Sequence, residues 1–235
     1  MGISQTEIGK LFGQRRHQVA VGQLTQDQYV RETLAQLGVE IDPSGQVILY
    51  HATTAELLAY IWTQKAIKPS ALTGERVYRT PLEETDDPDD LDKKEKVYLA
   101  TREEIERSGD GITAKIQDDR GGGIYILRVK VDQANLEPDE DNSGGDWLES
   151  LARYSHSCSH RGPIIDFKIA RRIPARLSEE RRLAYVQRTI KAIEAGYPEK
   201  ASAIEKEAKA VQEQIQRQED DLLRSVAIQV ETIPS

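Results

Sequence analysis

Alternating apolar and polar positions predict four short strands along this chain. The clearest is residues 124–131, where β-branched and aromatic side chains follow three glycines. Residues 46–50 contain four consecutive β-prone side chains, and residues 96–100 read Lys-Val-Tyr-Leu-Ala. A fourth strand is expected at about residues 166–172. These strands form the β part of the predicted fold.

Apolar residues at helical spacing predict helices around the strands. The expected helical segments are two within residues 4–37 with a break at Gly22, then 54–65, 101–108, one or two turns within 146–154, about 178–196, and about 199–223. Thr25, Thr54, Thr101 and Ser178 stand where an N-cap residue is expected. The last two helices form a helical hairpin around Gly196.

The remaining segments are expected to be connectors. Residues 80–95 and 136–141 are acidic and contain prolines, which is typical of exposed loops. Residues 155–162 are small and polar. Residues 226–230 are read as an edge strand or a frayed helix end.

The most informative stretch runs from Gln46 to Thr54. Its apolar part leads into His51-Ala-Thr-Thr, which we expect to turn directly into the next helix. A buried strand that ends on a histidine is a common way to build a site, because the strand fixes the backbone and the turn presents the imidazole. An ordinary polar residue at a strand end explains His51 equally well.

The order of elements predicts an α+β fold with a split β core and flanking helices. We divide the chain into an N-terminal helical lead-in at residues 1–41, the core at residues 42–176, and the C-terminal helical hairpin at residues 177–235. The hairpin either packs on the core or mediates self-association.

Composition narrows the function classes. The chain has 235 residues and a net charge of −8, so a general nucleic-acid-binding role, which needs a basic face, is not expected. No apolar run approaches the roughly 20 residues of a membrane helix. The N-terminus lacks the features of a signal peptide, and the single cysteine allows no internal disulfide. We therefore expect a cytoplasmic protein.

Local motifs for metal, thiol or phosphate chemistry are weak. His156, Cys158 and His160 alternate along one segment, but the spacing matches no common zinc motif, and we expect no metal. The same three residues are too crowded to assign roles in a Cys/His hydrolase. Gly121-Gly122-Gly123 precedes a strand rather than a helix, so it does not aim a helix N-terminus at phosphate.

Two of the predicted strands carry motifs of a known family. Tyr50-His51-Ala52-Thr53 resembles the Tyr-His-Gly-Thr motif of the ADP-ribosyltransferase superfamily, in its His-Tyr-Glu branch. Val97-Tyr98-Leu99-Ala100-Thr101 resembles the second motif of that branch, an aromatic residue on a strand just before a helix.

Later segments are similar to those of uncharacterised bacterial members of the family. They are residues 123–132 with the acidic residues after them, 147–151, and 158–164. The resemblance covers about residues 46–173. The third motif residue, usually a glutamate, is not evident, and the aligned position offers Ser157, Ser159 and His160.

The resemblance implies NAD as cofactor, bound in a cleft between two small sheets. It makes Tyr50, His51, Ala52, Thr53 and Tyr98 the cofactor-binding residues. His51 would hydrogen-bond the adenosine ribose, backbone groups near Ala52 would hold the nicotinamide amide with Thr53 supporting them, and Tyr98 would line the nicotinamide pocket. Catalytic roles would fall to His51, Tyr98 and His160.

Two functions remain open at this stage. The first is an NAD-dependent ADP-ribosyltransferase that acts on an unknown acceptor, most simply a protein. The second is a non-catalytic binding or structural module of the same fold. Its interaction surface would be the hairpin, with a homo-oligomer or a partner protein held through residues 178–224.

Overall fold

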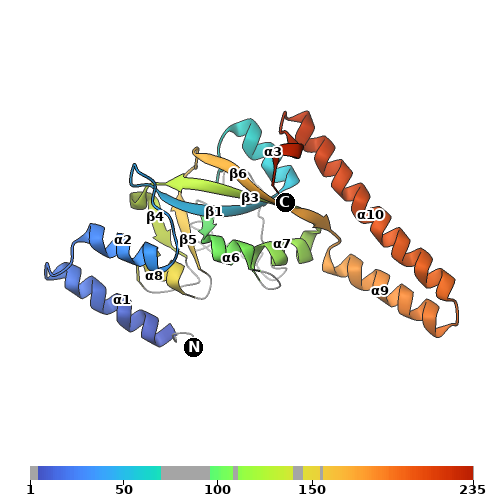
Figure 1. Cartoon of the computed structure of the whole chain (residues 1–235), viewed down its shortest axis with the longest axis horizontal. Helices are drawn as coiled ribbons and strands as arrows, with labels where there is room; N and C mark the ends of the chain where they lie inside the picture. Colours follow the sequence, from blue (N-terminus) through green and yellow to red (C-terminus); the bar gives the residue numbers. More distant parts are fainter. Residues whose placement is uncertain (1–4, 70–95, 108–110, 140–144, 154–155, 235) are drawn as a thin grey trace, which may run out of the picture. The chain divides into compact units, whose positions relative to one another are not determined.

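The computed structural model describes residues 5–69, 96–107, 111–139, 145–153 and 156–234. The helices are α1 (Gln5–Ala20), α2 (Gln26–Gln36), α3 (Ala55–Gln64), α6 (Arg102–Glu106), α7 (Ile112–Arg120), α8 (Trp147–Ala152), α9 (Glu179–Glu194) and α10 (Pro198–Ser225) (Figure 1). Two short 3-10 helices are η1 (Gln133–Asn135) and η2 (Val230–Thr232). The acidic segment at residues 80–95 lies outside the described residues.

Six strands form one sheet. They are β1 (Val47–Thr54), β2 (Lys96–Ala100), β3 (Gly122–Val131), β4 (Leu136–Pro138), β5 (Ser157–Arg161) and β6 (Phe167–Arg176), in the spatial order β4-β5-β2-β1-β3-β6. The pairs β1–β2, β2–β5 and β4–β5 are antiparallel. Mixed helices and antiparallel sheet confirm the α+β class.

The chain divides into two compact units, each built from several segments. Unit 1 consists of Met1–His51, Ala66–Glu106 and Arg128–Lys168, and unit 2 consists of Ala52–Lys65, Arg107–Leu127 and Ile169–Ser235. These units cut across the three consecutive domains that the sequence suggests. They are described separately below.

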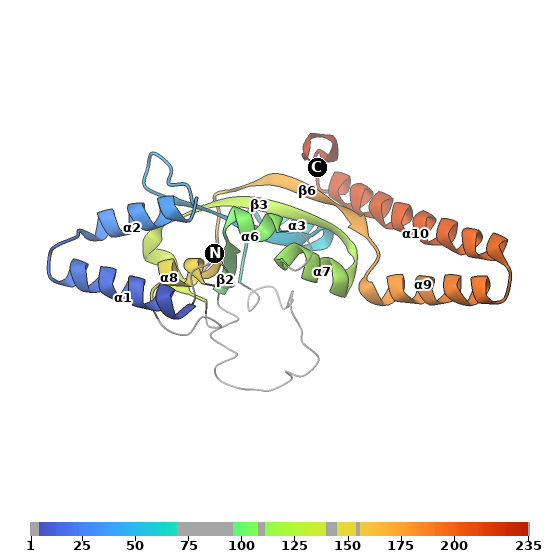
Figure 2. The same cartoon turned by 60° about the horizontal axis from the view of Figure 1, so that its bottom comes forward.

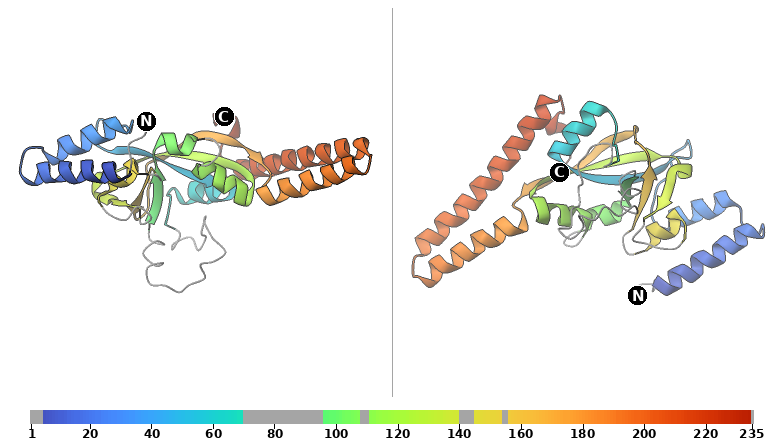
Figure 3. Two further views of the ribbon diagram at one scale, coloured as in Figure 1. Left: turned by 90° about the horizontal axis from the view of Figure 1, so that it is seen from below. Right: turned by 180° about the vertical axis from the view of Figure 1, so that it is seen from behind.

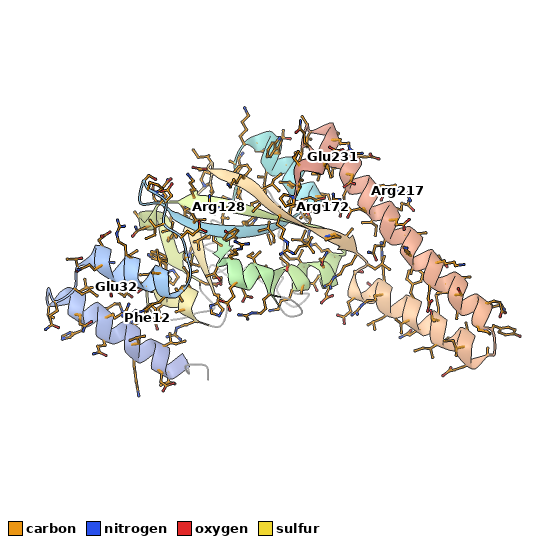
Figure 4. The ribbon with its side chains drawn as sticks, viewed as in Figure 1. Phe12, Glu32, Arg128, Arg172, Arg217 and Glu231 are labelled. Carbon is orange, nitrogen blue, oxygen red and sulfur yellow. The ribbon has the colours of Figure 1, made fainter. Side chains whose placement is uncertain are left out.

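In unit 1 the two N-terminal helices form as predicted. Thr25 caps α2 with a full capping box. Its hydroxyl accepts a hydrogen bond from the main-chain N–H of Gln28 at 3.1 Å, and the side-chain oxygen of Gln28 accepts one from the main-chain N–H of Thr25 at 3.0 Å. Phe12, on α1, packs edge-to-face on Tyr29, with ring centroids 6.3 Å apart. Helices α1 and α2 lie side by side, and Figure 4 labels Phe12 on α1 and Glu32 on α2.

A buried carboxylate fastens these helices to α8. Glu149 is 1% exposed, and its carboxylate pairs with Arg16 of α1 at 2.6 Å and with Arg153. Asp146 caps α8 at the Glu149 amide and also accepts from the Tyr29 hydroxyl at 2.8 Å. The N-terminal helices therefore pack on α8 of the same unit through specific polar contacts.

Three expectations for unit 1 and its neighbouring segments were wrong. β1 does not end at Tyr50 but continues to Thr54, because the β-branched Thr53 and Thr54 are buried within the sheet. Leu136–Pro138 is a strand rather than an acidic loop, paired with β5. Ser157–Arg161, to which no strand was assigned, lies between β2 and β4.

Unit 2 contains the buried first half of β3. Ile124, Tyr125, Ile126 and Leu127 are 0–2% exposed. The helix α7 before it was not predicted, and Gly121 ends it in a backbone conformation with φ 73°. A Cβ at Gly121 would lie 2.8 Å from the Ser178 amide nitrogen, so this position requires glycine.

The C-terminal helices of unit 2 form the predicted hairpin. Figures 2 and 3 show α9 and α10 running side by side in opposite directions, joined at Gly196. Helix α10 also packs on α3, and Leu223 near its end is fully buried. The tail is neither strand nor frayed helix, because Ile228, Val230 and Ile233 bury their side chains around η2. Among the described residues no helix has the length and apolarity to span a membrane.

Candidate active site

The histidine at the centre of the sequence motif contacts the neighbouring strand. β1 and β2 pair at Tyr50 and Ala100, and the next residue, His51, reaches β2 with its side chain. The His51 Nδ1 lies 3.0 Å from the main-chain oxygen of Tyr98. The structure thus joins the two motif residues through the main chain of β2.

This contact fixes the chemistry of the imidazole. A carbonyl oxygen only accepts hydrogen bonds, so Nδ1 carries the proton and Nε2 of the neutral ring is an acceptor. Burial lowers the pKa of His51 below its ordinary value, and the hydrogen bond to Tyr98 opposes this in part. Near neutral pH His51 therefore offers an acceptor nitrogen on a half-buried ring.

Tyr98 belongs to a row of side chains that crosses three strands. It lies directly opposite Ser159 on β5, and Ser159 lies directly opposite Glu137 on β4. Residues paired in this way share one face of a sheet. Tyr50 shares this face too, because it lies opposite Ala100, two residues from Tyr98. Tyr98 is 39% exposed.

Glu137 is held at the end of this row by two cations. Its carboxylate accepts from Arg161 Nε at 2.9 Å, and Lys96 Nζ lies 3.2 Å away. Partial burial acts to raise the pKa of Glu137, but the ion pairs outweigh it and hold the pKa below the ordinary value. Glu137 is therefore an ionised carboxylate in a fixed position, two strands from Tyr98.

His160 lies on the opposite face from Tyr98. It pairs with Val97 and Leu136, is 5% exposed, and its Nδ1 lies 3.2 Å from the oxygen of Gly162. Burial lowers its pKa below the ordinary value. The structure does not bring His160 to the Tyr98 row, so its assigned catalytic role stays a prediction without support from this geometry.

The other two motif residues continue β1 into unit 2. Ala52 and Thr53 are buried, and the Thr53 hydroxyl has no hydrogen-bond partner among the described residues. Thr54 occupies the N-cap position of α3 without a side-chain hydrogen bond to its amides.

The residues considered for zinc or thiol chemistry do not form a cluster. Cys158 and His160 share a buried face of β5, but His156 precedes the strand with φ 43°, and its Nδ1 lies 3.0 Å from the Leu151 oxygen. Burial raises the pKa of the Cys158 thiol, so it is a poor nucleophile. Within the described ranges no three His, Cys, Asp or Glu residues are placed to hold a metal ion.

Sequence reasoning selected His51 and Tyr98 as candidate site residues but did not select Glu137. The residue was read as part of an acidic loop, whereas the β4–β5–β2 register places its carboxylate in the Tyr98 row. Leu136 is the one apolar residue within three positions of Pro138, so the sequence carries no alternating pattern that would indicate this short strand. Comparisons with protein-family models, with curated proteins and with solved structures found no match to this chain.

Proposed function

We propose that the protein binds NAD and transfers its ADP-ribose group to an acceptor, most simply a protein. The observation that carries the proposal is the contact of His51 with the Tyr98 main chain, made by the two residues that resemble the first two motifs of ADP-ribosyltransferases. The contact leaves Nε2 of a neutral imidazole as a hydrogen-bond acceptor, on a histidine that is bonded to the main chain of the strand carrying the partly exposed Tyr98.

Each group suits one part of NAD. The Nε2 atom of His51 accepts a hydrogen bond from a ribose hydroxyl, which is a donor of the matching kind. The rings of Tyr50 and Tyr98 offer apolar faces for stacking with the planar nicotinamide. Backbone groups near Ala52 pair with the nicotinamide amide, which needs one donor and one acceptor.

The reaction needs negative charge near the ribose. The bond between the ribose C1′ and nicotinamide breaks, nicotinamide leaves with the bonding electrons, and an acceptor nucleophile forms the new bond to C1′ and loses its proton to solvent or a nearby base. The transition state resembles an oxocarbenium ion, which a carboxylate stabilises. Glu137 is the carboxylate of the Tyr98 row, so we assign it this electrostatic role.

Nicotinamide release from NAD tests the proposal. The wild-type protein is expected to release nicotinamide, with transfer of labelled ADP-ribose in the presence of a cell extract. His51→Ala and Tyr98→Ala are expected to lower the rate by about tenfold or more, because each removes a hydrogen bond or a stacking surface of the site. Tyr197→Ala is the matched control, since Tyr197 is a comparably exposed tyrosine at the hairpin turn.

Two results of these assays would contradict the proposal. If folded wild-type protein releases no nicotinamide and transfers no label across a broad panel of acceptors, the enzyme proposal fails. Equal rates for wild type, His51→Ala and Tyr98→Ala would place the activity elsewhere on the chain.

A second candidate function rests on an exposed apolar stripe of α9. Leu183, Val186, Ile190 and Ile193 recur at intervals of three and four residues and are 47–59% exposed. A soluble helix normally buries such a stripe, and α9 buries none of its residues in this chain. We propose, as the alternative, a binding or structural module that uses the hairpin to self-associate.

Sedimentation equilibrium tests this alternative. Wild-type protein is expected to form an oligomer and Ile190→Glu to be monomeric, because a charge in the centre of an apolar interface is strongly unfavourable. Gln187→Glu, an exposed neighbour on the same helix, is the control and should leave the oligomer intact. A monomeric wild-type protein would remove the self-association proposal.

A further inference from the structure

Unit 2 contains a cavity of about 420 Å³ that the proposed NAD chemistry does not use. It lies between the start of α3, the glycine turn before β3, and α10. Its volume falls in the range that holds small organic ligands. Four charged residues line it, and they are Glu56, Arg120, Arg181 and Glu219.

Glu219 is the unusual member of this lining. Its side chain is only 6% exposed. One carboxylate oxygen, Oε1, accepts from the Gly123 amide at 2.8 Å, while the other, Oε2, has no hydrogen-bond partner among the described residues. A buried carboxylate oxygen without a donor is costly, so the protein keeps this group at the expense of stability.

The glycine turn is shaped around this carboxylate. A Cβ at Gly122 would lie 2.5 Å from Glu219 Oε1, and a Cβ at Gly123 would lie 2.7 Å from Oε2. Only glycine lets the main chain approach so closely. The close approach of this turn to Glu219, which is 96 residues from Gly123 in the chain, therefore depends on the absence of a Cβ at Gly122 and Gly123.

The surroundings of Glu219 favour a cationic partner. Burial raises the pKa of its carboxyl group above the ordinary value, and the nearby carboxylates of Glu56 and Asp220 act in the same direction. Arg172 acts the other way, but its guanidinium pairs with Asp220. A bound ammonium or guanidinium group would relieve the repulsion between Glu56 and Glu219 and supply the missing donor.

The two arginines of the same lining favour a second, anionic group on the ligand. Arg120 and Arg181 are both exposed, and Arg guanidinium groups bind carboxylates in a planar, two-point fashion. We propose that this cavity binds a small zwitterion that carries an ammonium or guanidinium group, directed to Glu219 and Glu56, and a carboxylate, directed to the arginines.

Calorimetric titration of the full chain with three probes tests the ligand class. L-Arginine carries both charged groups and is expected to bind. Agmatine lacks the carboxylate and succinate lacks the cation, so each is expected to bind about tenfold more weakly or worse. No heat from L-arginine with folded protein would overturn the proposal, and so would equal affinity for all three probes.

Two variants test the residues. Glu219→Gln keeps the acceptor for the Gly123 amide but removes the charge, and Arg181→Gln changes an exposed side chain without disturbing the core. Each variant is expected to weaken L-arginine binding about tenfold or more. Glu205 is exposed on α10, the helix that carries Glu219, and Glu205→Gln is the control that should leave binding unchanged. Unchanged binding in Arg181→Gln and Glu219→Gln would overturn the proposal. Because these titrations contain no NAD, their outcome is independent of the enzyme proposal.

Discussion

Replacing Glu149 by Gln is expected to lower the free energy of unfolding by about 3–5 kcal/mol. The carboxylate is 1% exposed and pairs with Arg16 and Arg153. The substitution keeps the shape of the side chain but removes the carboxylate that pairs with Arg153 and the nearer of two that pair with Arg16, the other being Asp146 at 3.9 Å. Because these arginines are partly exposed, with 38% and 23% of their side chains accessible, we expect the lower end of this range.

Urea denaturation followed by circular dichroism measures the effect. Glu103→Gln is the matched control, since Glu103 is exposed on α6 and its substitution should change stability by less than about 0.5 kcal/mol. A Glu149→Gln protein as stable as the control would mean that the N-terminal helices are not fastened to α8 through this carboxylate.

Replacing Leu127 by Ala is expected to lower the free energy of unfolding by about 2–5 kcal/mol. Leu127 lies in the middle of β3 and is fully buried, so the truncation leaves a cavity that the neighbouring strands cannot fill. The same substitution at Leu183, which is 49% exposed on α9, should cost less than about 1 kcal/mol. Similar losses for both variants, measured in the same denaturation series, would contradict the placement of β3 in the core.

The sequence predicted those elements whose stabilising contacts join residues close together in the chain. The capping box at Thr25 involves a residue three positions away, and the β3 alternation lies within one segment. Similarly, the hairpin follows from two apolar stripes and the break at Gly196. In each case the interactions that decide the structure lie within a few residues of sequence.

The elements that the sequence did not predict depend on contacts between distant segments or carry weak local patterns. β5 reads Ser-Cys-Ser-His-Arg, a polar pattern that becomes buried only because β2 and β4 pair on its two edges. The helix α7 is weakly amphipathic, so it carries little periodic signal. β1 runs on through Thr53 and Thr54 because the surrounding sheet buries them.

The same distinction holds for the candidate site. His51 and Tyr98 stand in local motifs, so the sequence alone was enough to select them as candidates. Glu137 and Glu219 acquire their surroundings from partners far away in the sequence, Arg161 and Lys96 for the first and Gly123 for the second. No local pattern marks either glutamate as special.

Calorimetric titration of NAD into the wild-type protein and His51→Ala tests the central claim most directly. We expect saturable binding to the wild type and a loss of about 1–3 kcal/mol of binding free energy in His51→Ala, because the Nε2 acceptor is removed. The exposed His17→Ala variant is the matched control and should bind like wild type. No binding of NAD to folded wild-type protein, or equal affinity for wild type and His51→Ala, would contradict the account.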